Sequence, residues 1–185
     1  MAGMADDVSG QGGAKAALTG RDGAVAAVTD LFRDHHLELV RLALLMVGDL
    51  ATAEDVVQDA FERLQRGWHG LRRPSSGLAY ARSSVLNGCR SVHRKAAVAR
   101  KHAPSLVEPH EPSTDTSLAA DDRSEVVAAL RLLPRRQREV LVLRYYLDLD
   151  VAEISATLRI TPSSVRSTTT RGLAALAQHY RRTDQ

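Results

Sequence analysis

Hydroxyl and guanidinium side chains recur near the C-terminus at spacings that place them together on one face of an expected helix. Serine and threonine hydroxyls reach DNA phosphates and base edges, and arginine takes the paired acceptors of guanine in the major groove. Residues 163–182 include four Arg and no acidic residue, so no carboxylate there would repel DNA. This face is therefore predicted to read duplex DNA, through Ser163, Ser164, Arg166, Ser167, Thr170 and Arg171.

Two short helices must position that face. Asp150 with Glu153 predicts the start of the first helix, which continues to residue 158. Thr161 with Pro162 predicts the start of the next, which runs to about residue 181. The short connection between them is typical of a helix-turn-helix, although an ordinary helical hairpin with a Ser/Thr-rich surface is the alternative. The expected inner core consists of Ile154, Leu158, Ile160, Val165, Leu173 and Leu176.

A second row of polar side chains lies upstream, on a helix expected to open with a Thr-x-x-Asp signal at residues 52–55 and to run to about residue 66. Apolar residues form a stripe along one side of this helix. The other side carries the acidic ridge, which consists of Asp55, Gln58, Asp59 and Glu62 at positions i, i+3, i+4 and i+7. Such a row suits a basic partner, but it is also common on a merely solvated helix face.

Charge is strongly segregated along the chain, although the formal net charge is only +3. Residues 63–107 include ten Lys or Arg and no acidic residue, whereas residues 108–125 include six acids and one Arg. Two basic stretches separated by an acidic connector indicate a polyanion held at two places. Solvated helix faces are the alternative, but the length of the first acid-free stretch favours nucleic acid.

The domain organisation follows from composition and apolar periodicity. Aromatic residues make up only 4% of the chain, which favours helices over sheets. Residues 1–22 are predicted to be a disordered leader, and the Pro-containing, acidic residues 102–122 a flexible linker. The expected fold is therefore all-α, with two small helical domains at 23–101 and 123–182, the second containing the helix-turn-helix.

Within the first domain, helices are expected at residues 25–47, 52–66 and 78–100, with a loop over 67–77. Asn87-Gly88 should interrupt the third helix as a turn or bend. In the second domain, helices at 124–133 and 135–146 should precede the helix-turn-helix, with Pro134 in a first-turn position.

Other chemistry has little support in the sequence. Cys89 and His93 share a helix face and His35-His36 are adjacent, but no further ligands complete a metal site, so no metal or cofactor is expected. No phosphate-binding Gly loop or nucleophile motif indicates an enzyme. The N-terminus does not read as a signal peptide, and the longest apolar run, at 42–47, is too short to cross a bilayer. A cytoplasmic protein without membrane insertion is expected.

The C-terminal half resembles the DNA-binding domain of sigma factors. The strings that carry this resemblance are LPRRQREVL at 133–141 with Tyr145, VAEI at 151–154 and SSVRS at 163–167. Similar strings occur in response-regulator DNA-binding domains. The first half of the chain must therefore decide between the two.

In that first half, AEDVVQDAF at 53–61 resembles the helix by which the sigma-70 superfamily docks on the clamp helices of the polymerase largest subunit. The string YARSSVLN at 80–87 resembles the segment that reads the minus-10 element in extracytoplasmic-function (ECF) sigma factors. An Asn amide at position 87 could bind the edge of an unstacked base, although it could also simply bend the helix. The resemblance implies minus-10 contacts by Tyr80, Arg82, Asn87, Arg90 and Arg94.

The whole folded part of the chain thus resembles an ECF sigma factor, similar to actinobacterial members of the SigE family. The resemblance implies that the acidic ridge binds core RNA polymerase and that the helix-turn-helix binds the minus-35 element of promoter DNA. It also allows an anti-sigma factor as a partner. The recognition helix departs from many relatives in its STTTR string at 167–171. A stand-alone helix-turn-helix regulator is the alternative, but it leaves the acidic ridge and the first basic stretch unexplained.

Overall fold

The computed structural model describes residues 21–71, 76–102 and 120–183. These residues form helices and short connections without any strand, which confirms the all-α class. The expected leader and linker fall largely on residues 1–20 and 103–119, outside the described part. The elements are α2 (Arg21–Val47), α3 (Leu50–Gly67), the 3₁₀ turn η1 (Trp68–Gly70), α4 (Gly77–His102), α5 (Ala120–Leu132), α6 (Arg135–Leu141), the π-helical turn η3 (Val142–Tyr146), α7 (Val151–Leu158) and α8 (Pro162–Thr183).

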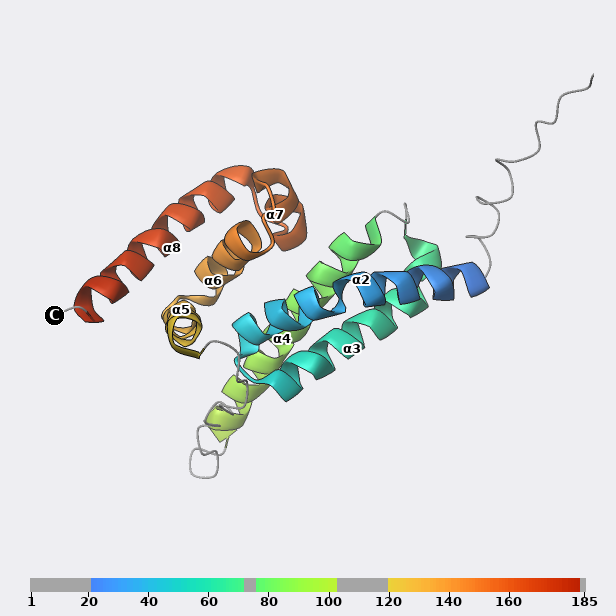
Figure 1. The fold of residues 1–185 in the computed structure, drawn as a ribbon, viewed down its shortest axis with the longest axis horizontal. Helices are drawn as coiled ribbons and strands as arrows, with labels where there is room; N and C mark the ends of the chain where they lie inside the picture. The colour runs from blue at the N-terminus through green and yellow to red at the C-terminus, as the bar shows by residue number, and fades with distance from the viewer. Residues whose placement is uncertain (1–20, 72–75, 103–119, 184–185) are drawn as a thin grey trace, which may run out of the picture.

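Helices α2, α3 and α4 pack into a first bundle (Figure 1). Leu39, Leu42, Val57, Leu64 and Val85 are fully buried in its core. Gly48 ends α2 with φ of +82°, a conformation that glycine adopts without steric cost, and its N–H donates to the Leu44 carbonyl at 2.8 Å. The three helices of this bundle therefore correspond to those expected from the apolar periodicity, and their ends differ by a few residues.

The start of α3 differs from the expected one. The helix begins at Leu50, and Asp49, not Thr52, is its N-cap. The Asp49 carboxylate accepts a hydrogen bond from the Thr52 N–H at 2.8 Å, which satisfies one of the donors left free at a helix start. The sequence thus predicted the start of this helix about one turn too far toward the C-terminus.

The prediction that Asn87-Gly88 breaks the third helix is wrong, because α4 continues through both residues. Gly88 faces α3, where a Cβ would lie 2.7 Å from Cγ1 of Val56. The glycine therefore serves close helix packing rather than a turn. The expected loop at 67–77 also contains the turn η1, whose Trp68 is buried.

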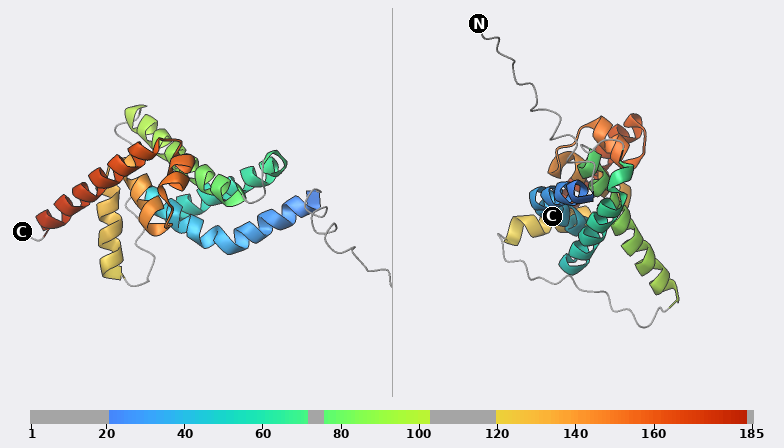
Figure 2. Two further views of the ribbon diagram at one scale, coloured as in Figure 1. Left: turned by 90° about the horizontal axis from the view of Figure 1, so that it is seen from above. Right: turned by 90° about the vertical axis from the view of Figure 1, so that its right-hand side faces the viewer.

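Helices α5 to α8 form the second bundle, from which α8 extends toward the C-terminus (Figure 2). Pro134 is the N-cap of α6 rather than a first-turn residue. The expected helix over 135–146 divides into α6 and the π-helical turn η3. Asp150 and Glu153 form the predicted helix start as a full capping box, with N···O distances of 2.7 and 2.8 Å.

The turn between α7 and α8 completes a helix-turn-helix. Arg159 adopts φ of +53° and reverses the chain, and the Thr161 hydroxyl accepts from the Ser164 N–H at 3.2 Å. Ile154, Leu158 and Val165 are buried as expected, but Leu173 is 43% exposed. The inner stripe of α8 runs instead through Val165, Thr168 and Gly172, because Gly172 lets α8 approach Leu141 of α6 closely.

Within the described residues, no helix is long and apolar enough to cross a bilayer.

Cys89 is 2% exposed on the inner side of α4, and this burial raises the pKa of its thiol from about 9 to about 12. Because folding disfavours the thiolate, Cys89 should destabilise the fold progressively as pH rises from about 9 toward 12, by about 1.4 kcal/mol per pH unit. We expect the unfolding free energy to fall more steeply between pH 8 and pH 10 in the parent protein than in Cys89→Ala, measured by urea unfolding. Parallel pH profiles of the two proteins would contradict this assignment.

Candidate functional site

The acidic ridge lies on the outer surface of α3, where all four of its residues are exposed. Asp59 accepts from Arg63 at 2.9 Å, and Glu62 lies 3.6 Å from Arg66. These are exposed pairs one helical turn apart, so each adds little to stability and can exchange for another cation. The sequence thus placed the ridge on the solvent side correctly.

An open groove of about 240 Å³ runs beside the ridge, between α2 and α3. Phe32 and Phe61 line it with ring centroids 5.0 Å apart in an edge-to-face arrangement, and Phe32 is 42% exposed. Gln58 and Glu62 of the ridge form its polar border. The groove is therefore an apolar cleft whose polar border includes the carboxylate of Glu62, a combination that the helical periodicity of α3 alone could not reveal.

Three of the five residues implied for minus-10 contact share one face of α4. Tyr80, Asn87 and Arg94 are spaced seven residues apart, and all three are exposed. The Asn87 amide oxygen accepts from Nη1 of Arg90 at 2.9 Å, and Arg94 donates to the Ser91 hydroxyl at 3.2 Å. This face therefore presents an aromatic ring, an amide and a cation along about four helical turns.

Arg82 points elsewhere, toward α2. Its Nη2 donates to Oε1 of Glu38 at 2.9 Å, and its side chain is only 15% exposed. In this structure Arg82 joins α4 to α2 and lies away from Tyr80 and Asn87.

Arg90 is engaged by the second bundle. Its Nε donates to Oε1 of Glu139 at 2.7 Å and its Nη2 donates to Oε2 at 2.9 Å, so the pair is bidentate. These hydrogen bonds raise the pKa of Arg90 above its ordinary value. Sequence reasoning missed Glu139, although it is the one acid in the basic string at 135–139.

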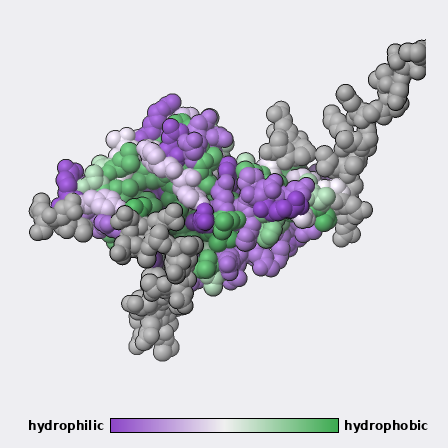
Figure 3. All heavy atoms as spheres, viewed as in Figure 1, coloured by the Kyte–Doolittle hydropathy of each residue, from purple (hydrophilic) through white to green (hydrophobic). Residues whose placement is uncertain are grey.

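The six residues predicted for duplex reading are all exposed along the first turns of α8. Hydrophilic side chains gather where α7 meets the start of α8 (Figure 3). Local bonds hold several of them, since Ser167 donates to the Ser164 carbonyl at 3.2 Å and Arg171 donates to the Ser167 carbonyl at 3.3 Å. Val165 and Thr168 occupy the opposite, buried side. The surface is therefore polar, and its six residues include no acid.

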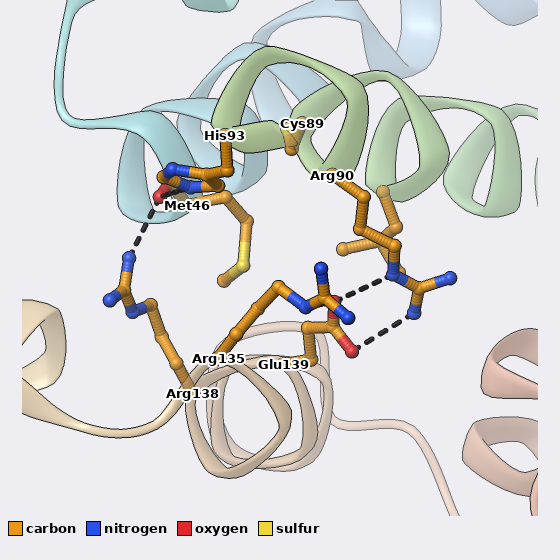
Figure 4. Close-up of a pocket in the computed structure, with 8 residues that line it drawn as sticks. Met46, Cys89, Arg90, His93, Arg135, Arg138 and Glu139 are labelled. Atoms are coloured by element: carbon orange, nitrogen blue, oxygen red, sulfur yellow. Dashed lines mark hydrogen bonds and ion pairs between the residues drawn. The ribbon is translucent and has the colours of Figure 1, made fainter. Parts of the chain in front are cut away.

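His93 forms a hydrogen bond with the Met46 carbonyl, in which Nε2 and the oxygen are 3.0 Å apart (Figure 4). In the described part of the chain, no three His, Cys, Asp or Glu residues come together as metal ligands.

Two family profiles match this chain. Sigma-70 region 2 matches residues 31–98, and sigma-70 region 4 matches residues 123–176. The first covers most of the α2–α4 bundle, and the second runs from within α5 to the middle of α8. Together they span more than half of the chain.

Curated relatives point to the same family. The ECF RNA polymerase sigma factor SigL of Mycobacterium tuberculosis is 31% identical over 86% of this chain and 87% of its own length. The RNA polymerase sigma-E factor of Streptomyces coelicolor is 29% identical over 84% of this chain and 87% of its own length.

Solved structures share the fold. CnrH, in complex with the cytosolic domain of CnrY, aligns with a TM-score of 0.63 at 21% identity over 86% of this chain and 96% of that one. RpoE of Bartonella quintana, in complex with the anti-sigma factor NepR, aligns with a TM-score of 0.65 at 20% identity over 80% of this chain and 95% of that one. With both sigma-70 regions present in order and relatives matched over most of their length, this chain belongs to the sigma-70 family as an ECF sigma factor, which directs RNA polymerase to promoters.

Proposed function

We propose that the acidic ridge on α3 is the docking surface for core RNA polymerase. The ridge supports this role because Asp55 and Asp59 are exposed carboxylates one turn apart, which can meet arginines of a basic helical partner. The adjoining groove, with Phe32 at its mouth, could take an apolar side chain from the same partner. If core polymerase docks on α3, the face of α4 that carries Tyr80, Asn87 and Arg94 stays accessible to DNA.

That face of α4 is proposed to contact the minus-10 element. The Asn87 amide can pair with the edge of an unstacked base, Tyr80 can stack on a base, and Arg94 can bind phosphate. Arg90 lies beside Asn87, to which its Nη1 donates, while its Nε and Nη2 bind Glu139. Arg82 contributes indirectly, because its ion pair with Glu38 holds α4 against α2.

The first turns of α8 are proposed to enter the major groove at the minus-35 element. The observation that carries this assignment is that all six candidate side chains lie on one exposed, acid-free face of the second helix of the helix-turn-helix. Arg166 and Arg171 can take guanine acceptors, while the hydroxyls bind phosphates and base edges.

We place the division between the two functional units at residues 23–101 and 123–182, joined by residues 102–122. The protein would work in the cytoplasm, where the polymerase acts, and the polymerase would carry out the chemistry, so the sigma factor itself is not an enzyme. An anti-sigma factor is a further proposed partner, as for RpoE of Bartonella quintana.

Replacing Arg171 or Arg166 with Ala tests the proposed minus-35 surface. If these residues read bases, each change should weaken binding of the polymerase holoenzyme to a cognate promoter by about 1–3 kcal/mol and relax sequence preference at one position. Filter binding to a promoter obtained by start-site mapping, together with single-base variants of its minus-35 element, would measure this effect.

Arg181→Ala provides the matched control, because Arg181 is an exposed arginine at the far end of the same helix. It should leave base preference unchanged. A loss that is equal on every sequence would make Arg166 and Arg171 phosphate contacts and would refute base reading by them.

A further inference from the structure

The outermost line of α8 carries hydroxyl groups between two arginines. Ser163, Ser167 and Thr170 stand at positions i, i+4 and i+7, so they follow one line along the helix, and all three are exposed. The same helical spacing places Arg166 on one side of this line and Arg171 on the other. The hydroxyls therefore lie at the centre of the surface that we propose enters the major groove, and the guanidinium groups lie at its borders.

Two of these hydroxyls already use their only proton within the helix. The Ser167 hydroxyl lies 3.2 Å from the Ser164 carbonyl, and the Thr170 hydroxyl lies 3.2 Å from the Arg166 carbonyl. A carbonyl oxygen can only accept a hydrogen bond, so each hydroxyl must be the donor. Because a serine or threonine hydroxyl has one proton and two lone pairs, Ser167 and Thr170 present acceptors to a DNA partner.

From this arrangement we infer that Ser167 and Thr170 select bases that present an amino group in the major groove, namely adenine and cytosine. The inference rests on the proposed minus-35 role of α8, and it adds which class of base two of its residues recognise. The N6 amino group of adenine and the N4 amino group of cytosine are donors, so each matches a hydroxyl lone pair. Guanine and thymine present the acceptors O6 and O4 instead, so either base would set acceptor against acceptor.

The same chemistry separates these two hydroxyls from phosphate contacts. The phosphate oxygens of DNA are acceptors without a proton to donate, so they cannot pair with a hydroxyl whose own proton is bound to the helix. To bind a phosphate, Ser167 or Thr170 would have to give up its hydrogen bond to the helix carbonyl. Recognition of an amino group keeps that hydrogen bond and adds a second one.

The hydroxyls at the start of α8 are bonded differently. The Thr161 hydroxyl lies 3.0 Å from that of Ser163 and 2.8 Å from that of Ser164, and either member of each pair can be the donor. Since donor and acceptor can exchange in these contacts, Ser163 and Ser164 can turn a proton toward a phosphate. The start of α8 therefore suits phosphate contacts, whereas the following turns suit base selection.

Arg171 relates the selected base to a neighbouring guanine. Its Nε donates to the Ser167 carbonyl at 3.3 Å, so the paired acceptors N7 and O6 of a guanine would be bound by Nη1 and Nη2. Ser167 and Arg171 are about 6 Å apart along the helix, which is close to the rise of two base pairs. We therefore expect a guanine within about two base pairs of the base that Ser167 selects.

Selection from randomised promoters by the polymerase holoenzyme tests the inference. A promoter obtained by start-site mapping is randomised across its minus-35 element, and the duplexes that the holoenzyme retains are sequenced. The parent should enrich adenine and cytosine over guanine and thymine about five- to tenfold at two positions, each on the strand that faces a hydroxyl. Thr170→Val should abolish this preference at one position and Ser167→Ala at the other. Thr170→Ser keeps the hydroxyl and should retain the preference.

Thr169→Val is the matched control for loss of a threonine hydroxyl. The Thr169 hydroxyl also donates within the helix, to the Val165 carbonyl at 2.9 Å, but its side chain is half-buried. This variant should leave every base preference unchanged.

A base analogue gives a second readout, in filter binding of the holoenzyme to a selected duplex. Purine in place of adenine removes the N6 amino group and keeps N7. At the position read by Thr170, this replacement should weaken binding of the parent about five- to tenfold and binding of Thr170→Val much less. An equal loss in the two proteins would overturn the inference, because the hydroxyl and the amino group would then act independently.

The selection can also contradict the inference in three ways. A preference for guanine or thymine that depends on these hydroxyls would overturn it, because they would then have to donate. A loss of affinity in Ser167→Ala and Thr170→Val that is equal on every sequence would make the hydroxyls phosphate contacts. Base preferences that survive unchanged in both variants would show that other residues produce them.

The proposed function fails in a different way. If α8 does not read the minus-35 element, the retained duplexes should show no base preference there, and Arg171→Ala should change nothing. If only the hydroxyl inference fails, a guanine preference that depends on Arg166 or Arg171 should remain.

Discussion

Reversing the charge of Asp55 and Asp59 together should abolish binding to core RNA polymerase. Both carboxylates are exposed on the acidic ridge, and Asp59 pairs with the neighbouring Arg63. Asp55→Arg with Asp59→Arg would place two cations where we propose that arginines of the partner bind. Close charge pairs across an interface couple by more than about 1.5 kcal/mol each, so the double change should weaken core binding about 100-fold or more.

The fold should tolerate this change, because exposed ion pairs add at most about 1 kcal/mol. Fluorescence titration with core enzyme measures the affinity, and circular dichroism verifies the helices. Asp34→Arg with Glu125→Arg is the matched control, since it makes the same charge change at exposed positions away from the ridge. Equal core affinity in the two double variants would refute docking through the ridge.

Gly88→Val should destabilise the first bundle by about 2–3 kcal/mol, although it replaces a poor helix former with a better one. A Cβ at position 88 would lie 2.7 Å from Cγ1 of Val56, and a β-branched neighbour cannot turn aside easily. Overpacking of this kind outweighs the gain of a few tenths of a kcal/mol in helix propensity. Separation of α3 from α4 should also weaken core binding and minus-10 binding together.

Urea unfolding measures the loss, and Val56→Ala provides the decisive comparison. In the Val56→Ala background, Gly88→Val should lower the unfolding free energy much less, because the shortened side chain at position 56 leaves room for the valine. Gly70→Ala is the control for replacing a glycine, since no atom lies within 4 Å of its added Cβ. If the effects of Gly88→Val and Val56→Ala on the unfolding free energy were simply additive, the contact with Val56 would not be the cause of the loss at position 88.

The ion pair between Arg90 and Glu139 could not be predicted from the sequence, which assigned Arg90 only to DNA. Arg90 stands in an acid-free stretch, so local sequence offers it no competing partner. Its partner, Glu139, is 49 residues away and lies in a string that is otherwise basic. An ion pair across that separation depends on how the bundles pack, which no helical periodicity records.

The sequence alone determined the helical class, the exposed acidic ridge, the capping box at Asp150 and the polar face of α8. Each follows from residues within one or two turns of one another, since helix periodicity and capping are local. Tertiary structure decided that Gly88 packs rather than bends, that Leu173 faces solvent and that Arg82 and Arg90 bind carboxylates instead of standing free. These outcomes depend on which helix approaches which, and close approach and charge pairing between distant segments are settled only when the helices pack.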